Sequence, residues 1–166
     1  MDLLDRLLGH DAWSTRQLLL QARPLNDAQL DQRFDIDRRT LRECFEHIIE
    51  NMEIWCDLMA GREVRDCGIE PQSRSIDGML ERLSAAGRDF AALSRRIARE
   101  DGWDGVYMDT LDQPPKPKTY GGTIAHLITH SMHHRAQVMY MLECLGVQEH
   151  IEGDVLSWES AAFGWA

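Results

Sequence analysis

The sequence predicts an all-α protein, an up-down four-helix bundle with a long crossover between helices three and four and a short C-terminal helix. Three observations support this prediction. Apolar residues recur at spacings of three and four in four long segments, as in helices that bury one face. A glycine or proline follows each segment, where helices commonly end. The 166 residues suffice for one hydrophobic core, so we expect residues 1–166 to form a single domain.

The four long helices are expected over approximately residues 2–22, 38–60, 73–101 and 121–145. Residues 25–37 are polar and turn-like, and either Asp37 or Thr40 is a suitable N-cap for the second helix. Residues 62–72 contain glycine and proline without a clear period, so we expect a loop there.

The longest connection is the crossover, residues 103–119. It begins with Trp103 and ends in a run with three prolines, which breaks the helical pattern. Because it is so long, it is expected to cross over the bundle and to contribute to the wall or lid of a pocket. After Gly146 we expect one short helix or ordered turn packed on the bundle.

The composition indicates a folded protein that binds neither nucleic acid nor membranes. Apolar residues make up 43% and charged residues 28% of the chain, which are ordinary values for a globular protein. The net charge of -10 would repel phosphates, and the 18 Lys and Arg residues are scattered. No segment approaches the ~20 apolar residues of a membrane span. Four cysteines, Cys44, Cys56, Cys67 and Cys144, form no C-x-x-C pair, so we expect reduced thiols and a cytoplasmic location.

The strongest chemical signal is a cluster of histidines in the expected fourth helix. Four of the seven histidines, His126, His130, His133 and His134, lie within nine residues of one another. In a helix His130 and His134 stand one turn apart on the same face, where two imidazoles can bind one metal ion. Catalytic metal sites usually have three protein ligands and one open position, so a third ligand is expected elsewhere in the chain.

His47 is the candidate for the third ligand. It lies beside the apolar stripe of the expected second helix, where a polar side chain can reach inward between helices. Together, His47, His130 and His134 predict an open three-histidine site for one divalent metal per chain. Zinc or nickel is expected there, with iron or manganese as alternatives, because the ligand type alone does not choose among them.

An acidic row lies along another face of the second helix and consists of Glu43, Glu46, Glu50, Glu53 and Asp57. Its simplest interpretation is a solvated face. On that interpretation none of these carboxylates is a general base, and the sequence leaves the catalytic residues unknown.

Several polar residues around the three histidines have alternative roles. His126 and His133 are expected at the periphery, and they and Gln137 are candidates for contact with substrate or for orienting the ligands.

Arg135 is expected to form a structural ion pair, with substrate recognition as the alternative. Cys44 is expected to be a small buried side chain, with metal ligation or redox chemistry as alternatives. Trp13, Trp55 and Trp103 are expected to be packing anchors, with a place in a pocket wall as the alternative, above all for Trp103 in the crossover.

The chain resembles the DinB/YfiT-like superfamily of four-helix-bundle metalloproteins. The resemblance is carried by LLGHDAWSTRQLL (residues 7–19), by LRECFEHIIENMEIWCDLMAG (41–61) and most specifically by GGTIAHLITHSMHHRAQVMYMLECLG (121–146), which holds an H-x-x-x-H-R-x-Q signature. These segments occur in the family's order. The resemblance implies that His47, His130 and His134 are the metal ligands and that His133, Arg135 and Gln137 are signature neighbours.

The resemblance also implies a function. Members of the superfamily include transferases and isomerases that depend on a low-molecular-weight thiol such as bacillithiol or mycothiol, and members commonly form homodimers. We therefore expect a metal-dependent thiol S-transferase acting on an electrophilic small molecule, in a homodimer. A metal-dependent hydrolase at the same site and a non-catalytic, stress-related dimer that binds a metal or ligand are the alternatives.

Overall fold

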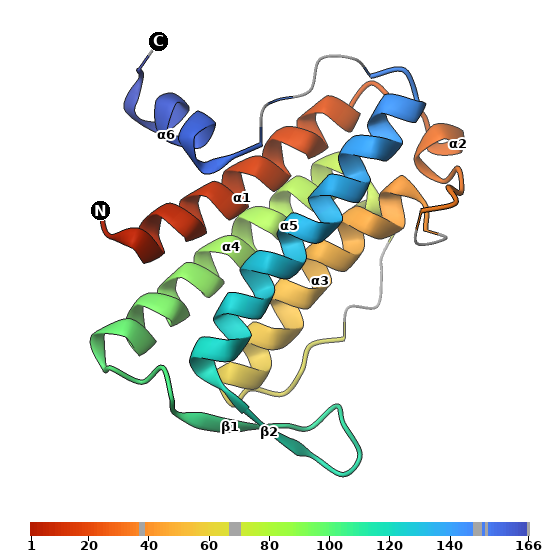
Figure 1. The fold of residues 1–166 in the computed structure, drawn as a ribbon. Coiled ribbons are helices and arrows are strands. Elements are labelled where there is room, and N and C mark those ends of the chain that lie inside the picture. The colour runs from red at the N-terminus through yellow and green to blue at the C-terminus, as the bar shows by residue number, and fades with distance from the viewer. Residues whose placement is uncertain (37–38, 67–70, 148–150, 152, 166) are drawn as a thin grey trace.

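The computed structural model describes residues 1–36, 39–66, 71–147, 151 and 153–165 (Figure 1). Four long helices form the bundle: α1 (Leu3–Ala22), α3 (Leu41–Met59), α4 (Ile76–Arg99) and α5 (Tyr120–Cys144). The shorter helical elements are α2 (Asp27–Leu30), the 3-10 turn η1 (Pro71–Arg74) and α6 (Val155–Phe163). The four long helices and the short C-terminal helix of the prediction are thus confirmed. No helix in the described part of the chain is long and apolar enough to cross a membrane.

Helix α3 begins at a capping box. The Thr40 hydroxyl accepts a hydrogen bond from the Glu43 amide at 3.1 Å, and the Glu43 carboxylate accepts one from the Thr40 amide at 2.8 Å. Thr40 is therefore the N-cap, whereas the alternative, Asp37, lies outside the described residues. The helix starts at Leu41, three residues later than the predicted start at residue 38.

The predicted up-down order of the helices is wrong, because α3 and α4 run parallel. Glu46 pairs with Arg74, at the end of η1 directly before α4, and Glu53, two turns further along α3, pairs with Arg82 inside α4, each at 2.7 Å. Both helices begin at the same end of the bundle (Figure 1). For α4 to run parallel to α3, the chain must go back along the length of α3 before α4 begins. The connection of residues 60–75 is long enough, since it can span ~50 Å when extended and α3 is ~28 Å long. Each of α1 and α3 packs against both α4 and α5.

The parallel packing also changes the environment of the acidic row. Glu46 and Glu53 are only 5% and 7% exposed, because they face the arginines of η1 and α4. Glu50 is half-buried, and burial raises its pKa above the ordinary value. The prediction of a solvated acidic face is therefore wrong. A helical projection shows which charges gather on one side, but it does not show what packs against them.

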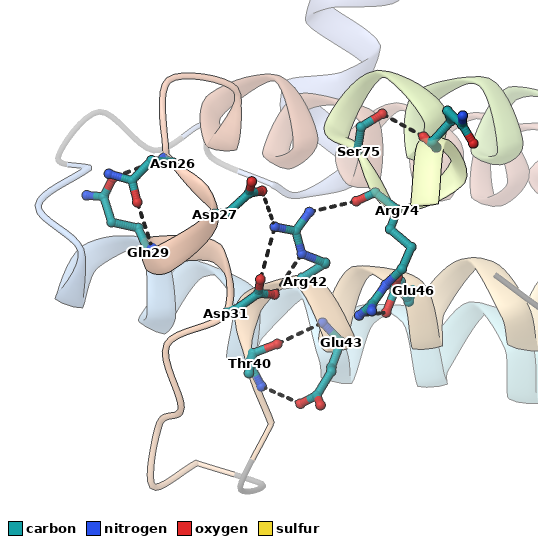
Figure 2. A network of polar contacts seen from close by, with 11 residues as sticks. Asn26, Asp27, Gln29, Asp31, Thr40, Arg42, Glu43, Glu46, Arg74 and Ser75 are labelled. Atoms are coloured by element: carbon teal, nitrogen blue, oxygen red, sulfur yellow. Dashed lines mark hydrogen bonds and ion pairs between the residues drawn. The ribbon is translucent and has the colours of Figure 1, made fainter. Parts of the chain in front are cut away.

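Arg42 joins the start of α3 to two neighbouring elements, as Figure 2 shows. Its guanidinium donates to Asp27 at 2.6 Å, to Asp31 at 2.7 Å and to the carbonyl of Arg74 at 2.8 Å. Arg42 is buried, and its hydrogen bonds to Asp31 and Asp27 raise its pKa above the ordinary value. This network fixes the start of α3, which carries His47 little more than one turn further on.

The crossover is not irregular, so the all-α prediction is wrong for this segment. Strands β1 (Val106–Asp109) and β2 (Lys116–Thr119) form an antiparallel hairpin in which Tyr107 pairs with Lys118. Side chains of β1 alternate between exposed and buried, with Tyr107 directed at the bundle. A two-stranded ribbon has only edge strands, which explains how β2 accommodates a proline.

Two side-chain contacts attach the hairpin to the start of α5. The Tyr107 and Tyr120 rings stack with centroids 5.3 Å apart. The Thr123 hydroxyl donates to the Thr119 carbonyl at 3.0 Å, so the Tyr107 hydroxyl is the donor in its 2.7 Å hydrogen bond to Thr123. The hairpin therefore lies directly beside the helix that carries the histidine cluster.

Helix α6 packs on α1 through one large side chain. Trp158 is 7% exposed, and its ring lies against Gly9, where a Cβ atom would approach the ring to 2.4 Å. Outside this contact, Arg6 pairs with Glu159 at 2.7 Å. The packed C-terminal helix of the prediction is confirmed.

We predict that Asp57→Asn lowers the free energy of unfolding by about 2 kcal/mol at pH 7. Asp57 is 2% exposed and accepts hydrogen bonds from Arg65 and Arg62 at 2.7 and 2.8 Å. Those bonds, from Arg65 first and then Arg62, hold its pKa well below the ordinary value of 3.8. Because the folded state has the lower pKa, the ionised carboxylate stabilises the fold above pH 3.8, and this contribution is lost as the pH falls below that value.

Urea denaturation at pH 7 and pH 3 measures the effect, and the difference between wild type and variant should narrow at the lower pH. Asp89→Asn is the matched control, because Asp89 pairs with Arg62 on the surface and should cost less than about 1 kcal/mol. If Asp57→Asn and Asp89→Asn lowered the free energy of unfolding equally, the stabilising role of the buried Asp57 carboxylate would be contradicted.

Candidate metal centre

Three histidines from two helices meet between α3 and α5. His47 comes from α3, and His130 and His134 come from consecutive turns of α5. One nitrogen from each ring lies within 4.8 Å of the corresponding nitrogens of the other two. The ring centroids are 4.4 to 4.9 Å apart. The structure therefore brings together the three residues that the sequence predicted as a set.

The orientation of His134 follows from its hydrogen bond to Gln137. The Nδ1 atom lies 2.6 Å from the Gln137 side-chain oxygen, which only accepts, so Nδ1 carries the proton. The other nitrogen, Nε2, is then a lone-pair donor, and it lies 3.2 Å from Nε2 of His130. His134 is only 5% exposed. This arrangement prepares Nε2 as a metal ligand, because the partner of the opposite nitrogen sets the tautomer.

Gln137 is itself held by His133. Its amide nitrogen lies 3.2 Å from Nε2 of His133, so Gln137 donates to His133 while it accepts from His134. His133 is exposed and does not belong to the group that could hold a metal, but it contacts Gln137, the residue that orients His134. The sequence-based candidates Gln137 and His133 thus form a short chain of hydrogen bonds behind one ligand.

His130 is uncharged at neutral pH. Burial, followed by the neighbouring His134 and His126, lowers its pKa to about 4. Its Nδ1 atom is buried and has no hydrogen-bond partner among the described residues. A neutral imidazole is the form that binds a metal, so no proton has to leave His130 at pH 7.

His47 is positioned by Asn51, one turn further along α3. The Asn51 amide donates to the main-chain carbonyl of His47 at 2.7 Å and lies 3.1 and 3.2 Å from the Nδ1 and Nε2 atoms of its ring. This role of Asn51 was not predicted from the sequence. The available signal was its spacing, since a polar residue four positions after His47 shares its helix face.

This donor set fits a divalent metal ion. Tetrahedral coordination at about 2.0 to 2.1 Å places ligand nitrogens about 3.3 Å apart. The 3.2 Å between the Nε2 atoms of His130 and His134 agrees with that spacing. No two of the three candidate ligand nitrogens lie more than 4.8 Å apart. The rings therefore have to move by less than about 2 Å to reach the tetrahedral spacing. The three histidines could therefore hold a metal ion with one coordination position left open.

Cys44 lies behind His134 rather than in front of it. Its sulfur is 3.9 Å from Nδ1 of His134, the nitrogen that donates to Gln137, and 3.6 Å from the His134 carbonyl. Cys44 is fully buried. The expectation of a small buried side chain is confirmed, and in this position the sulfur is on the wrong side of the ring to be a fourth ligand.

His126 extends the row of imidazoles beyond the cluster. It is exposed, and its ring centroid lies 5.1 Å from that of His130 and 6.2 Å from that of Trp55. It does not belong to the group of residues that could hold a metal. Its peripheral position agrees with the sequence-based expectation.

Arg135 faces away from the three histidines, toward α1. Its guanidinium pairs with Asp11 at 2.5 Å and lies 3.3 Å from the Thr15 hydroxyl. Arg135 and Asp11 are 4% and 1% exposed. The structural ion pair expected for Arg135 is confirmed, and it attaches α5 to α1.

A helical bundle in which two neighbouring helices bring three histidines to one point is a helical protein with a candidate metal centre. A comparison with models of protein families identifies the family within this class. Residues 12–138, which include all three histidines, match the model of the DinB superfamily, and the chain belongs to that superfamily. The resemblance stated from the sequence motifs is therefore confirmed.

The fold is similar to the crystal structure of a DinB-like protein from Bacillus cereus. The TM-score is 0.61 at 18% sequence identity, over 82% of this chain and 87% of that one. At this identity the likeness supports the fold alone. No curated protein matches the chain.

We predict that Arg135→Met destabilises the protein by about 3 kcal/mol, because it leaves the Asp11 carboxylate buried without its partner. Replacing both residues, as in Asp11→Leu with Arg135→Met, should recover most of that loss, since no uncompensated charge remains. Thermal or urea unfolding of the wild type, the two single variants and the double variant gives the coupling free energy between Asp11 and Arg135. Losses that simply add would show that the pair is not the reason for the burial of Arg135.

Proposed function

We propose that the protein is a divalent-metal-dependent enzyme that transfers a low-molecular-weight thiol to an electrophilic small molecule. One observation carries the proposal: His47, His130 and His134 present ring nitrogens within 4.8 Å of one another. Zinc or nickel is the metal that we infer for this set, with iron or manganese as alternatives.

A divalent metal held by His47, His130 and His134 would supply Lewis-acid activation and would lower the pKa of a bound thiol or water molecule. The protein supplies the orientation of the donors. Gln137 and His133 hold the ring of His134, and Asn51 holds that of His47. Partners of this kind commonly change metal affinity or activity by ~10- to 100-fold when they are removed.

The surroundings of the centre favour a thiol over water as the nucleophile. Hydrolysis generally needs a general base beside the attacking water. Among the described residues, the cluster that could hold a metal contains histidines and no carboxylate. The buried carboxylates of α3 instead pair with arginines on the side of α4. A metal-activated thiol is already a nucleophile and needs no such base.

Wild-type protein, produced without a histidine tag and without added metal, should contain close to one equivalent of a divalent metal per chain. His134→Ala should lose it, because two imidazoles seldom make a stable site. His126→Ala is the matched control one turn beyond His130, and it should retain the metal. Elemental analysis by mass spectrometry measures all three proteins. Wild type that stays metal-free after reloading with zinc or nickel would contradict the proposal.

The metal-loaded protein should consume an electrophilic aromatic halide only when a low-molecular-weight thiol is added. His134→Ala should abolish this turnover, because the metal is lost, and its circular dichroism spectrum should show that the fold is kept. The thioether product is measured by chromatography, with glutathione, bacillithiol and mycothiol tested in turn. Turnover that is independent of thiol would instead support a hydrolase, and a rate no higher than that of thiol and halide without protein would support a non-catalytic protein.

A further inference from the structure

A cavity of about 520 Å³ lies one helical turn from the candidate metal centre. Its walls come from α3, from β2 and from the start of α5, and they are formed by Trp55, Pro117, Lys118, Thr119, Gly122, Thr123 and His126. The His126 ring separates it from His130, with centroids 5.1 Å apart. One turn of helix is about 5.4 Å, so the cavity lies beside the candidate centre. A second groove of about 490 Å³, between α1 and α4, contains none of the three histidines.

Lys118 gives this cavity a positive charge in a strongly acidic protein. Of the 18 Lys and Arg residues in the chain only two are lysines, and both are in β2. Lys118 is paired across the hairpin with Tyr107, and directly opposed residues project on the same face of a sheet. Because Tyr107 is buried against Thr123, Lys118 also projects toward the bundle.

The two lysines have different surroundings. Lys116 is exposed and pairs with Asp112 at 3.3 Å. Lys118 is half-buried, and no carboxylate in the described part of the chain forms an ion pair with it. No acidic residue lines the cavity either. A half-buried ammonium without a protein counter-charge is suited to bind the charge of an anionic ligand.

Trp55 supplies a flat apolar wall of the cavity. Its side chain is half-buried and packs partly on the core, and its ring lies edge-on to His126 at 6.2 Å. Large aromatic surfaces of this kind bind planar groups by stacking and by burial of apolar area. Trp55 was interpreted from the sequence as a packing anchor, and the structure shows that it both packs on the core and lines the cavity.

We propose that this cavity binds the planar anionic part of the substrate, a small aromatic or conjugated carboxylate. The carboxylate lies at Lys118, the planar group lies against Trp55, and the electrophilic end points past His126 toward His130. This inference rests on the proposed function, because it names the class of molecule that the metal centre acts on. It assigns Lys118 and Trp55 to substrate binding and gives the hairpin a role in recognition.

The test uses 2-naphthoate, a planar aromatic carboxylate, as the probe and 2-naphthylmethanol as its uncharged counterpart. Binding is measured by calorimetry on wild type, Lys118→Gln and the matched control Lys116→Gln, each with and without zinc. Lys118→Gln should weaken naphthoate binding about tenfold, the effect of one charge-assisted contact. Lys116→Gln should change it less than twofold, and the alcohol should bind weakly and equally to all three proteins.

A second measurement uses wild type alone. Naphthoate should protect Lys118 from acetylation by acetic anhydride, while acetylation of Lys116 in the same peptide stays unchanged, as read by tandem mass spectrometry. Equal protection of the two lysines would overturn the proposal, as would the absence of naphthoate binding at millimolar concentration.

Zinc content, measured on the same samples, separates this proposal from the proposed function. Naphthoate binding that requires zinc and is unaffected by Lys118→Gln would overturn the cavity assignment and leave the metal-dependent function intact. Binding that depends on Lys118 in a protein unable to hold any metal would support the cavity and contradict the proposed function.

Discussion

The antiparallel packing of α3 against α5 is the contact on which the candidate site depends. It brings His47 opposite two consecutive turns of α5, so that no loop has to position a ligand. Each of the two helices is also anchored to a third element by a buried arginine. Arg42 ties α3 to α2 and to the turn before α4, and Arg135 ties α5 to α1. Side chains on anchored helices hold their geometry better than side chains on loops.

The polar groups around the three histidines extend this positioning from the backbone to the rings. His134 donates to Gln137, which donates to His133, and the Asn51 amide contacts His47. Burial keeps His130 uncharged, and ring nitrogens of the three histidines lie close together. On another face of α3, Glu46 pairs with Arg74, directly before α4, and Glu53 pairs with Arg82 of α4. Helix α3 thus separates a charged face that packs toward α4 from the face that carries His47.

Local periodicity explains why much of the site could be predicted from the sequence. The one-turn spacing of His130 and His134 and the place of His47 beside an apolar stripe are properties of single helices. The Thr40 cap and the positions of the long helices are local as well. These features need no knowledge of how the helices are arranged.

What could not be predicted depends on contacts between distant segments. The length of the connection after α3 permits α4 to run in either direction, and only the pairing of Glu46 with Arg74 and Glu53 with Arg82 reveals the parallel one. The four-residue strands are too short to show a period among the prolines, and the inward direction of Lys118 follows from its pairing with Tyr107. The homodimer and the cytoplasmic location stay predictions, and Cys67 lies outside the described residues.

The central claim is an open three-histidine metal site, and X-ray absorption spectroscopy of zinc-loaded protein tests it most directly. In buffer without thiol, the account predicts three imidazole nitrogens at about 2.0 Å from the zinc, one further light-atom ligand from the solvent, and no sulfur. Added thiol should then introduce one sulfur at about 2.3 Å. A sulfur shell in the protein without added thiol, as Cys44 would give, or fewer than three imidazoles, would contradict the account.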